Sequence, residues 1–219
     1  RRAVDLEPQP TVRTDSQFEW TERERPDVIC LQEIKSTVAQ VPAALCELQG
    51  YRCYWHGARA YSGVGLHIRR DAFAEEPVFS HPAFDFETRI VTAQIKDFVF
   101  TSVYVPNGGK DFPAKIEFLH QLETFITDVH SRGLRMILCG DINIARSERD
   151  VHPKERNPKL VGQRPEEREL FERILARGPV DVGRALDPDN DDLFTWWAPW
   201  RKLRERNIGW RLDYVLASE

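Results

Sequence analysis

The chain has 219 residues, 41% of them hydrophobic and 11% aromatic, and its formal net charge is −4. This length and apolar content suit one domain with a sizeable core, or at most two domains. The negative net charge excludes a global basic field, so a nucleic acid would have to be held by a local basic patch or through metal ions.

Strand-like apolar runs alternate with segments of helical period, which indicates an α/β fold. Six strands are expected, over residues 27–31, 64–68, 90–95, 98–105, 134–139 and 212–217. The first and the fifth are apolar enough to be covered on both faces. Because only Lys96 and Asp97 separate the third strand from the fourth, these two should form an antiparallel hairpin within a mixed sheet.

Two helices are expected from hydrophobic spacing. Between residues 105 and 134, apolar side chains recur every three to four positions, and Gly133 provides the stop. The second helix should cover residues 165–177, because it begins with a proline, carries acidic residues in its first turn and is followed by a glycine. Residues 145–164 are polar and charged and contain two prolines, which predicts a long surface loop.

The cysteine pattern and the lack of a targeting segment favour a reduced, intracellular protein. The four cysteines lack Cys-x-x-Cys spacing, and two of them lie in apolar runs where a thiol behaves as a small hydrophobic group. No stretch approaches the roughly 18 consecutive apolar residues of a membrane span, and the start of the chain has no apolar core of a signal peptide. We expect a cytoplasmic protein with no membrane segment, and a monomer by default.

Two carboxylates follow buried strands in the sequence. Glu33 comes after "DVICLQ" and Asp141 after "LRMILCG", and ligands of α/β sheets bind beyond such strand ends. Either carboxylate could instead cap the turn that follows it. Asn143 favours a shared site, because side chains two residues apart on a strand face the same side. Asp141 could then take a proton while Asn143 donates a hydrogen bond to an oxyanion.

Seven motifs in chain order resemble the exonuclease III family of abasic-site endonucleases, within the endonuclease/exonuclease/phosphatase superfamily. They are "LQE" (31–33), "YSGVG" (61–65), "YVPNGG" (104–109), "FPAKIEFL" (112–119), "CGDINIA" (139–145), "FTWW" (194–197) and "GWRLDYVLAS" (209–218). The resemblance covers residues 18–219 and leaves residues 1–17 unmatched. It implies a four-layer α/β sandwich, with two mixed β-sheets packed face to face and helices outside, that hydrolyses DNA phosphodiesters with Mg²⁺ or Mn²⁺.

The resemblance also implies roles for single residues. Glu33 corresponds to the family's metal-ligand glutamate. Tyr104 corresponds to the tyrosine near the scissile phosphate, and Asn107 to a phosphate-contacting amide. Asp141 corresponds to the aspartate that activates or positions the attacking water, and Asn143 to the asparagine that hydrogen-bonds the phosphate oxygen.

Further motif positions concern orientation and substrate binding. Asp213 resembles the aspartate that orients a catalytic histidine. Three apolar residues resemble the lining of a pocket that receives a flipped-out abasic sugar and excludes a normal base: Trp196, Trp210 and Leu212. Ordinary core or surface packing is the alternative for each tryptophan.

Basic residues near these motifs suit contacts with DNA. Lys110 lies where family members can send a basic side chain into the duplex, and a solvated lysine is the alternative. The cluster of Arg201, Lys202, Arg204 and Arg206 suits phosphate contacts and equally suits a solvated loop. His67 and His81 match no motif, and His67, within "VGLHI", reads as a satisfied core or edge residue.

Two parts of the family pattern are missing from the sequence. Residues 1–17 contain no "WNVNG"-type strand, and the chain stops before the "SDH" segment that supplies an aspartate and the catalytic histidine. None of the six histidines takes that histidine's place. We therefore expect a chain cut at both ends, and a 219-residue polypeptide that is nearly inactive although its parent is an enzyme.

The predicted function is repair of double-stranded DNA that carries abasic sites or blocked 3′ ends. The expected activities are cleavage 5′ to an abasic site, 3′–5′ exonuclease and 3′-phosphodiesterase. A catalytically dead DNA-binding or scaffold domain of the same fold is the competing hypothesis. Within the superfamily a lipid or inositol phosphate is also possible, but "YVPNGG" and "GWRLDY" favour DNA.

Overall fold

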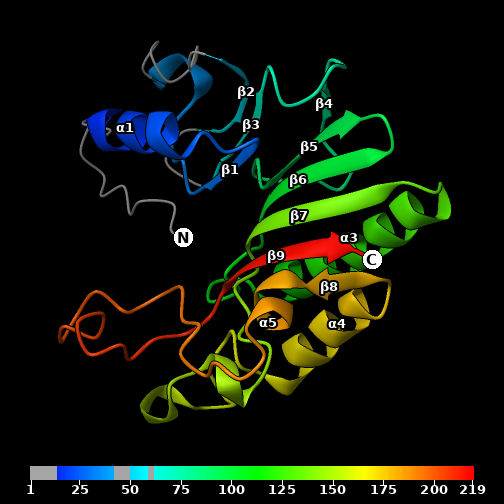
Figure 1. Ribbon diagram of the computed structural model, residues 1–219. Coiled ribbons are helices and arrows are strands. Elements are labelled where there is room, and N and C mark those ends of the chain that lie inside the picture. Colours follow the sequence, from blue (N-terminus) through cyan, green and yellow to red (C-terminus); the bar gives the residue numbers. More distant parts are fainter. Residues whose placement is uncertain (1–13, 42–49, 59–61) are drawn as a thin grey trace. The chain divides into compact units, whose positions relative to one another are not determined.

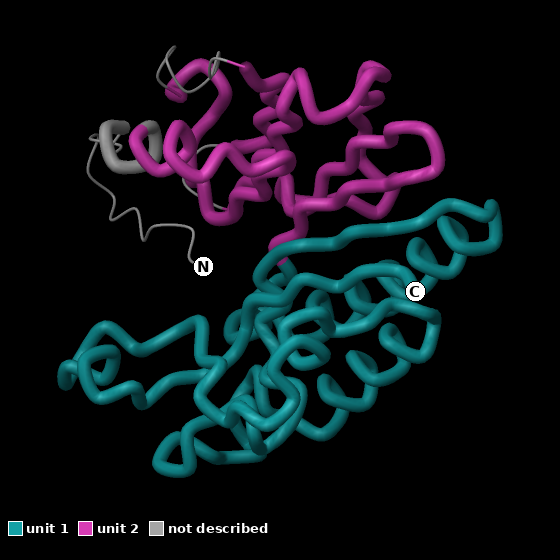
Figure 2. Tube along the Cα trace, viewed as in Figure 1, with its two compact units in different colours: residues 1–2, 105–219 teal, residues 3–104 magenta. Residues whose placement is uncertain are grey.

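The computed structural model describes residues 14–41, 50–58 and 62–219, without the side chains of residues 14–18. The chain forms two compact units, and the boundary falls between Tyr104 and Val105 (Figure 2). Each unit has strands and helices of its own, and the expected α/β class is confirmed.

The unit that ends at Tyr104 contains two groups of antiparallel strands (Figure 1). The first group has the order β1-β3-β2, with β1 at Val28–Gln32, β2 at Tyr51–His56 and β3 at Val64–Arg69. The second has the order β4-β5-β6, with β4 at Val78–Ser80, β5 at Ile90–Ile95 and β6 at Phe98–Tyr104. Helix α1 (Thr14–Glu24) and the single 3₁₀ turn η1 (Val38–Gln40) complete the described part of this unit.

The predicted hairpin of β5 and β6 is confirmed. Its two strands pair from Ile90 opposite Val103 to Ile95 opposite Phe98. Lys96 adopts a positive φ of 52°, which lets the chain reverse within two residues. The prediction that the first strand is covered on both faces is wrong, since every residue of β1 stays partly exposed. The physical reason is that, among the described strands, β1 lies at the edge of its group, with β3 as its neighbour on one side.

The two strand groups of this unit pack face to face around a core that includes Val64, Leu66, Ile68, Ile90 and Val103. Ser102 ties β6 to β1, because its Oγ donates to Leu31 O at 3.1 Å and accepts from Gln32 Nε2 at 3.0 Å. These bonds fix the end of β1 beside the end of β6. Glu33, which follows β1, and Tyr104, the last residue of β6, are thereby brought together.

The unit that begins at Val105 is built on three antiparallel strands in the order β7-β9-β8. They are β7 (Arg135–Asp141), β8 (Pro179–Asp181) and β9 (Asp213–Ser218). Helices α3 (Phe112–Ser131) and α4 (Pro165–Leu175) pack against each other and against this sheet (Figure 1), and the short α5 (Val182–Leu186) follows β8.

Both predicted helices are confirmed. Asp111 caps α3 by accepting a hydrogen bond from Ala114 N, and five apolar side chains of this helix are buried: Phe118, Leu119, Leu122, Ile126 and Val129. Helix α4 begins at the predicted proline and ends at Leu175, two residues before the predicted limit of 177. Glu123 of α3 joins the two helices through ion pairs of 2.6 Å with Arg173 and with Arg177.

Residues 145–164 form a long connection, as predicted, with the 3₁₀ turns η2 (Glu148–Asp150) and η3 (Pro153–Glu155). It is not purely a surface loop, since Asp150 and Gln163 are buried. Arg211 anchors it by donating to Asp150 Oδ1 at 2.7 Å while it also pairs with Asp181. Among the described residues, no helix combines the length and the apolarity that crossing a bilayer requires.

Candidate active site

The functional candidates of the first unit meet at the ends of β1 and β6. The Tyr104 hydroxyl donates to Glu33 Oε1 at 2.6 Å. Glu33 itself has a positive φ of 54°, an uncommon conformation for a residue other than glycine, and it turns the chain immediately after β1. Its other oxygen, Oε2, pairs with Lys35 Nζ at 3.1 Å. The carboxylate therefore sits at a sharp turn, fixed on one side by a phenol.

Arg89 packs beside Tyr104 in the same unit. Its guanidinium carbon lies 5.0 Å from the centre of the Tyr104 ring, and its Nη1 donates to the Tyr104 carbonyl at 3.4 Å. The same guanidinium is held by Glu87 Oε2 at 2.7 Å. This arrangement limits rotation of the phenol that contacts Glu33.

Asn143 is the centre of the candidate group in the second unit. Its backbone N donates to Asp141 Oδ1 at 2.8 Å, and its Nδ2 donates to Asp141 Oδ2 at 3.2 Å and to Val105 O at 2.9 Å. Its Oδ1 accepts from Asn107 Nδ2 at 3.1 Å. The structure thus brings Asp141, Asn143 and Asn107 together within hydrogen-bonding distance.

The reason that Asp141 and Asn143 meet differs from the predicted one. Strand β7 ends at Asp141, and Asn143 has a positive φ of 56°. The two side chains therefore meet because a turn folds the Asn143 amide back onto the Asp141 carboxylate. They are not two alternate positions of one continuing strand. Asparagine tolerates this left-handed conformation better than most residues.

A buried ion pair holds the backbone of Asn143 and Asn107 in place. Lys115 of α3 and Glu167 of α4 have side chains with no exposed surface and are in direct contact. Lys115 Nζ also donates to Asn143 O at 2.8 Å and to Asn107 O at 3.2 Å. Glu167 Oε2 in turn accepts from Gly162 N at 2.7 Å. One lysine thus ties together the two segments that carry the candidate amides.

Burial lowers the pKa of Lys115 below its ordinary value, and the adjacent Glu167 carboxylate opposes that shift. The ammonium is the form that can donate to Glu167 and to both carbonyl oxygens. Sequence reasoning did not identify Lys115 or Glu167. A signal existed, because Lys115 falls on the face of α3 shared with the buried Leu119 and Leu122, where a charge requires a partner.

The predicted pocket residues Trp196, Trp210 and Leu212 also lie together. Leu212 belongs to a buried cluster with Ala145 and Val151, and both tryptophans pack against it. The two indoles meet edge to face with ring centres 5.8 Å apart, and their backbones are bonded in both directions. This geometry suits an apolar wall and equally suits packing, so the pocket role stays a prediction.

Asp213 begins β9 directly opposite Asp141 of β7. Its backbone N donates to Thr195 Oγ1 at 3.0 Å. The three histidines of this unit are His120, His130 and His152. The ring of His130 bonds Arg177 O and Ser218 Oγ, and that of His152 accepts from Lys154 N. That no histidine here takes the family's catalytic place stays a prediction.

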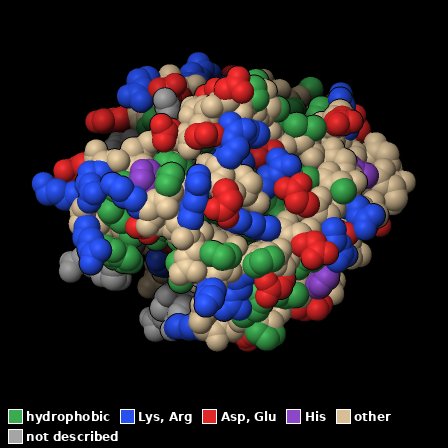
Figure 3. Space-filling model, turned by 90° about the horizontal axis from the view of Figure 1, so that it is seen from below, with side chains coloured by type: hydrophobic (Ala, Val, Ile, Leu, Met, Phe, Trp, Pro, Cys, Tyr) green, Lys and Arg blue, Asp and Glu red, His purple; other side chains and the backbone are tan. Residues whose placement is uncertain are grey.

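The basic candidates are all exposed. Within the cluster of residues 201–206, the Arg204 guanidinium lies 5.6 Å from the centre of the Trp197 ring, and Lys202 pairs loosely with Glu205 at 3.5 Å. Lys110 is exposed in the loop before α3. On the face shown in Figure 3, basic side chains are interspersed with acidic ones, as the net charge of −4 leads one to expect.

His67 is buried, and the prediction that its hydrogen bonds are satisfied is wrong for one ring nitrogen. Its Nδ1 has no hydrogen-bond partner among the residues that the structure describes, and the ring packs edge to face on Trp55. Burial lowers the pKa of His67 to about 4, so the imidazole is neutral at pH 7.

The family model described as "Endonuclease/Exonuclease/phosphatase family" matches residues 11–219. The chain belongs to that family. The resemblance drawn from the seven motifs is therefore confirmed. DNA repair nuclease APEX1 of Danio rerio is 32% identical over 209 residues, which cover 92% of this chain and 67% of that protein.

Two further comparisons agree with this family assignment. The exodeoxyribonuclease of Bacillus subtilis (strain 168) is 31% identical over 205 residues, which cover 91% of this chain and 80% of that protein. Among solved structures, 3′ phosphatase NExo from Neisseria, bound to product DNA hairpin, has a TM-score of 0.83 at 27% identity. That match covers 95% of this chain and 82% of the other.

The chemistry of Glu33 fits the divalent cation that the family resemblance implies. Carboxylate oxygens are the preferred ligands of Mg²⁺ and Mn²⁺. Glu33 Oε1 is oriented by Tyr104, while the partner of Oε2 is an exposed lysine that an arriving cation can displace. Glu33 therefore offers one fixed and one exchangeable carboxylate oxygen.

Proposed function

We propose that this chain carries catalytic residues of a DNA repair nuclease that hydrolyses the phosphodiester 5′ to an abasic site, with 3′–5′ exonuclease and 3′-phosphodiesterase activity. The observation that carries the proposal is the carboxylate of Asp141 clamped through both oxygens by Asn143. A carboxylate with a fixed orientation can position a water molecule and accept its proton. The names of the zebrafish, Bacillus and Neisseria relatives support DNA as the substrate.

The proposed chemistry assigns separate tasks to the two groups. Glu33 holds Mg²⁺ or Mn²⁺, which when bound polarises the phosphoryl group and steadies the 3′ leaving oxygen. Asp141 accepts the proton of the attacking water. The single hydroxyl hydrogen of Tyr104 is donated to Glu33, so its donation toward developing charge on the phosphate would require release of that bond. Asp213 remains a proposed orienting residue for an imidazole.

The hydrogen bonds of Asn143 refine its proposed role. Its Nδ2 carries two hydrogens, and its two bonds, to Val105 O and to Asp141 Oδ2, use both. Donation to a phosphate oxygen would therefore require release of the longer bond to Asp141. Asn107 uses one amide hydrogen on Asn143. We accordingly assign phosphate contact to Asn107 first, and orientation of Asp141 to Asn143.

For substrate binding, we propose that Trp196, Trp210 and Leu212 line the pocket for the abasic sugar. Lys110 and the basic residues 201–206 would contact the DNA backbone. We further propose that the chain acts on double-stranded DNA as a monomer inside the cell.

The test is incision of a duplex with one abasic site, in Mg²⁺ and in EDTA. It compares the 219-residue chain with an extended chain that carries, at both ends, the corresponding segments of the Bacillus subtilis relative. We expect only the extended chain to cut, only with Mg²⁺, and Asp141→Ala to abolish cutting. Binding of the abasic duplex without cutting by the extended chain would favour the dead DNA-binding domain instead.

A further inference from the structure

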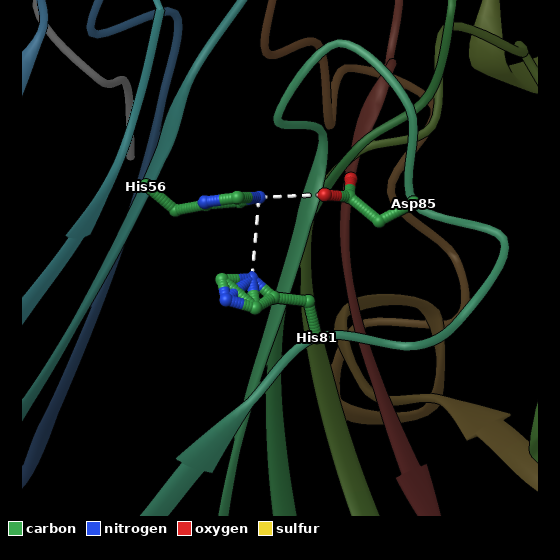
Figure 4. A group of neighbouring side chains, drawn as sticks. All are labelled: His56, His81 and Asp85. Carbon is green, nitrogen blue, oxygen red and sulfur yellow. Dashed lines mark hydrogen bonds and ion pairs between the residues drawn. The ribbon is translucent and has the colours of Figure 1, made fainter.

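We propose that His56, His81 and Asp85 form a binding site for a transition-metal ion such as Zn²⁺, separate from the proposed Mg²⁺ ligand Glu33. The three side chains come from the end of β2, from the residue after β4 and from the connection to β5, and they point toward one another (Figure 4). Two imidazoles and one carboxylate form a donor set typical of zinc and unsuited to Mg²⁺.

The spacing of the donor atoms suits one small ion. His56 Nε2 lies 2.6 Å from Asp85 Oδ2 and 3.3 Å from His81 Nδ1, and all three donors lie within 4.8 Å of one another. In a tetrahedral site with bonds of about 2.0–2.1 Å, neighbouring ligand atoms are about 3.4 Å apart. The histidine pair already has that separation. The carboxylate has to withdraw by less than about 1 Å, a change that rotation of its side chain can supply.

The remaining polar atoms of two ligands are already held by neighbours. His81 Nε2 is bonded to the Tyr54 hydroxyl at 2.9 Å, and Asp85 Oδ1 accepts from Arg89 N at 2.8 Å and from Ile90 N at 3.2 Å. Such outer hydrogen bonds orient metal ligands and select the nitrogen that binds. Here they leave His81 Nδ1 and Asp85 Oδ2 directed at His56 Nε2.

An ion can reach the cluster from solvent. His81 is exposed, and the side chains of His56 and Asp85 keep 18% and 11% of their surface accessible. Three protein ligands leave a fourth position for water. The competing explanation is an ion pair between Asp85 and a protonated His56, which accounts for the 2.6 Å contact. That explanation does not require a second imidazole nitrogen to face the same point.

The site has a structural consequence for the neighbouring candidate group. Asp85 receives the backbone N–H of Arg89, whose guanidinium packs on the Tyr104 ring. A metal ion that fixes Asp85 would therefore stiffen the segment that positions Arg89. The metal proposal itself concerns binding alone and does not depend on nuclease activity.

The test is titration of the 219-residue chain with Co²⁺, a spectroscopic substitute for Zn²⁺, in excess Mg²⁺ to occupy sites made only of oxygen. We expect one equivalent to bind with a visible tetrahedral spectrum and no thiolate charge-transfer band, and Zn²⁺ to displace it. His81→Ala should weaken binding at least about tenfold, and Tyr54→Phe by about tenfold through lost orientation. The matched control is His120→Ala, which removes a histidine of α3 and should leave binding unchanged.

Folding of each variant is checked by far-ultraviolet circular dichroism, and His81 is exposed enough to be replaced without loss of the fold. Histidine ring ¹⁵N shifts of the unmutated chain give a second readout, in which Zn²⁺ should move the signals of His56 and His81 alone. Absence of Co²⁺ and Zn²⁺ binding would overturn the proposal. A thiolate band, or binding that survives His56→Ala with His81→Ala, would do the same.

Discussion

The Glu33–Tyr104 group and the Asp141–Asn143 group differ in how firmly the chain holds them. The Glu33 side chain keeps 40% of its surface exposed and has one phenol and one exposed lysine as partners. Asn143 is 6% exposed, and its backbone N, its Nδ2 and its Oδ1 all make hydrogen bonds. Behind Asn143 lies a fully buried ion pair.

This difference matches the tasks that we propose for the two groups. A metal ligand must exchange its partner for an ion, so a carboxylate with one displaceable contact is appropriate. A residue that positions water or a phosphate must keep its orientation, because small displacements of a reacting group cost large factors in rate. The predictions below test whether the firmly held Asp141–Asn143 group positions the reacting groups and the more exposed Glu33–Tyr104 group binds the metal ion.

The largest expected effect is on catalysis. Asp141→Asn in the extended chain should lower the rate of abasic-site incision by roughly 10²–10⁴-fold, because the amide cannot accept a proton from water. The fold should survive, since the new side-chain oxygen can still accept from Asn143 N. Single-turnover incision gives the rate and thermal unfolding gives the stability. A rate within tenfold of the unmutated chain would remove Asp141 from the mechanism.

The next largest effect is on stability. Lys115→Met should lower the free energy of unfolding by about 3–5 kcal/mol, because it leaves Glu167 buried without its cation. The matched control is Lys110→Met, an exposed lysine nearby, which should change stability by less than about 0.5 kcal/mol. Urea unfolding measures both. Equal effects of the two substitutions would show that the network under Asn143 is not the rigid support that we describe.

Sequence patterns predicted the long, regular elements of both units. Helices α3 and α4 have clear apolar spacing and strong end signals, and all six predicted strands are present to within about two residues. The missed elements had weaker signals: α1 is almost wholly polar, and β4 and β8 have three residues each. Strand β2 contains arginine, histidine and cysteine among its aromatics, which hid its alternation.

The candidate groups were predicted less completely, for physical reasons. Asp141 and Asn143 were paired correctly, but strand alternation was the wrong cause, because a left-handed backbone at Asn143 is a tertiary feature. Lys115 and Glu167, which lie on two different helices, are 52 positions apart in the sequence. His56 and His81 lie 25 positions apart, and no local pattern predicts that such residues meet.

A third effect concerns pH and the interior of the first unit. His67 has a pKa of about 4 when folded and about 6.5 when unfolded, so between these values the unfolded chain binds more protons. The resulting loss of stability is absent well above pH 6.5 and grows as pH falls toward 4. From pH 7 to pH 5 it should amount to about 2 kcal/mol. His67→Phe should remove that part of the pH dependence, and His120→Asn should not.

Urea unfolding at a series of pH values measures the His67 effect as the difference between the two pH profiles. Parallel profiles for the unmutated chain and His67→Phe would mean that the folded chain admits the protonated ring. The buried environment of β3 would then be more adaptable than that of Lys115.

The smallest expected effect on stability is at Lys35. Its pair with Glu33 is exposed on both sides, so Lys35→Met should change the free energy of unfolding by less than about 1 kcal/mol. Removal of the ammonium frees Glu33 Oε2, and the affinity for Mn²⁺, measured by electron paramagnetic resonance, should therefore rise severalfold. The matched control is Lys96→Met, which removes another exposed lysine paired with a glutamate, Glu75. Weaker Mn²⁺ binding by Lys35→Met would mean that the lysine orients the carboxylate, and Glu33 would then be a preformed ligand like the clamped Asp141.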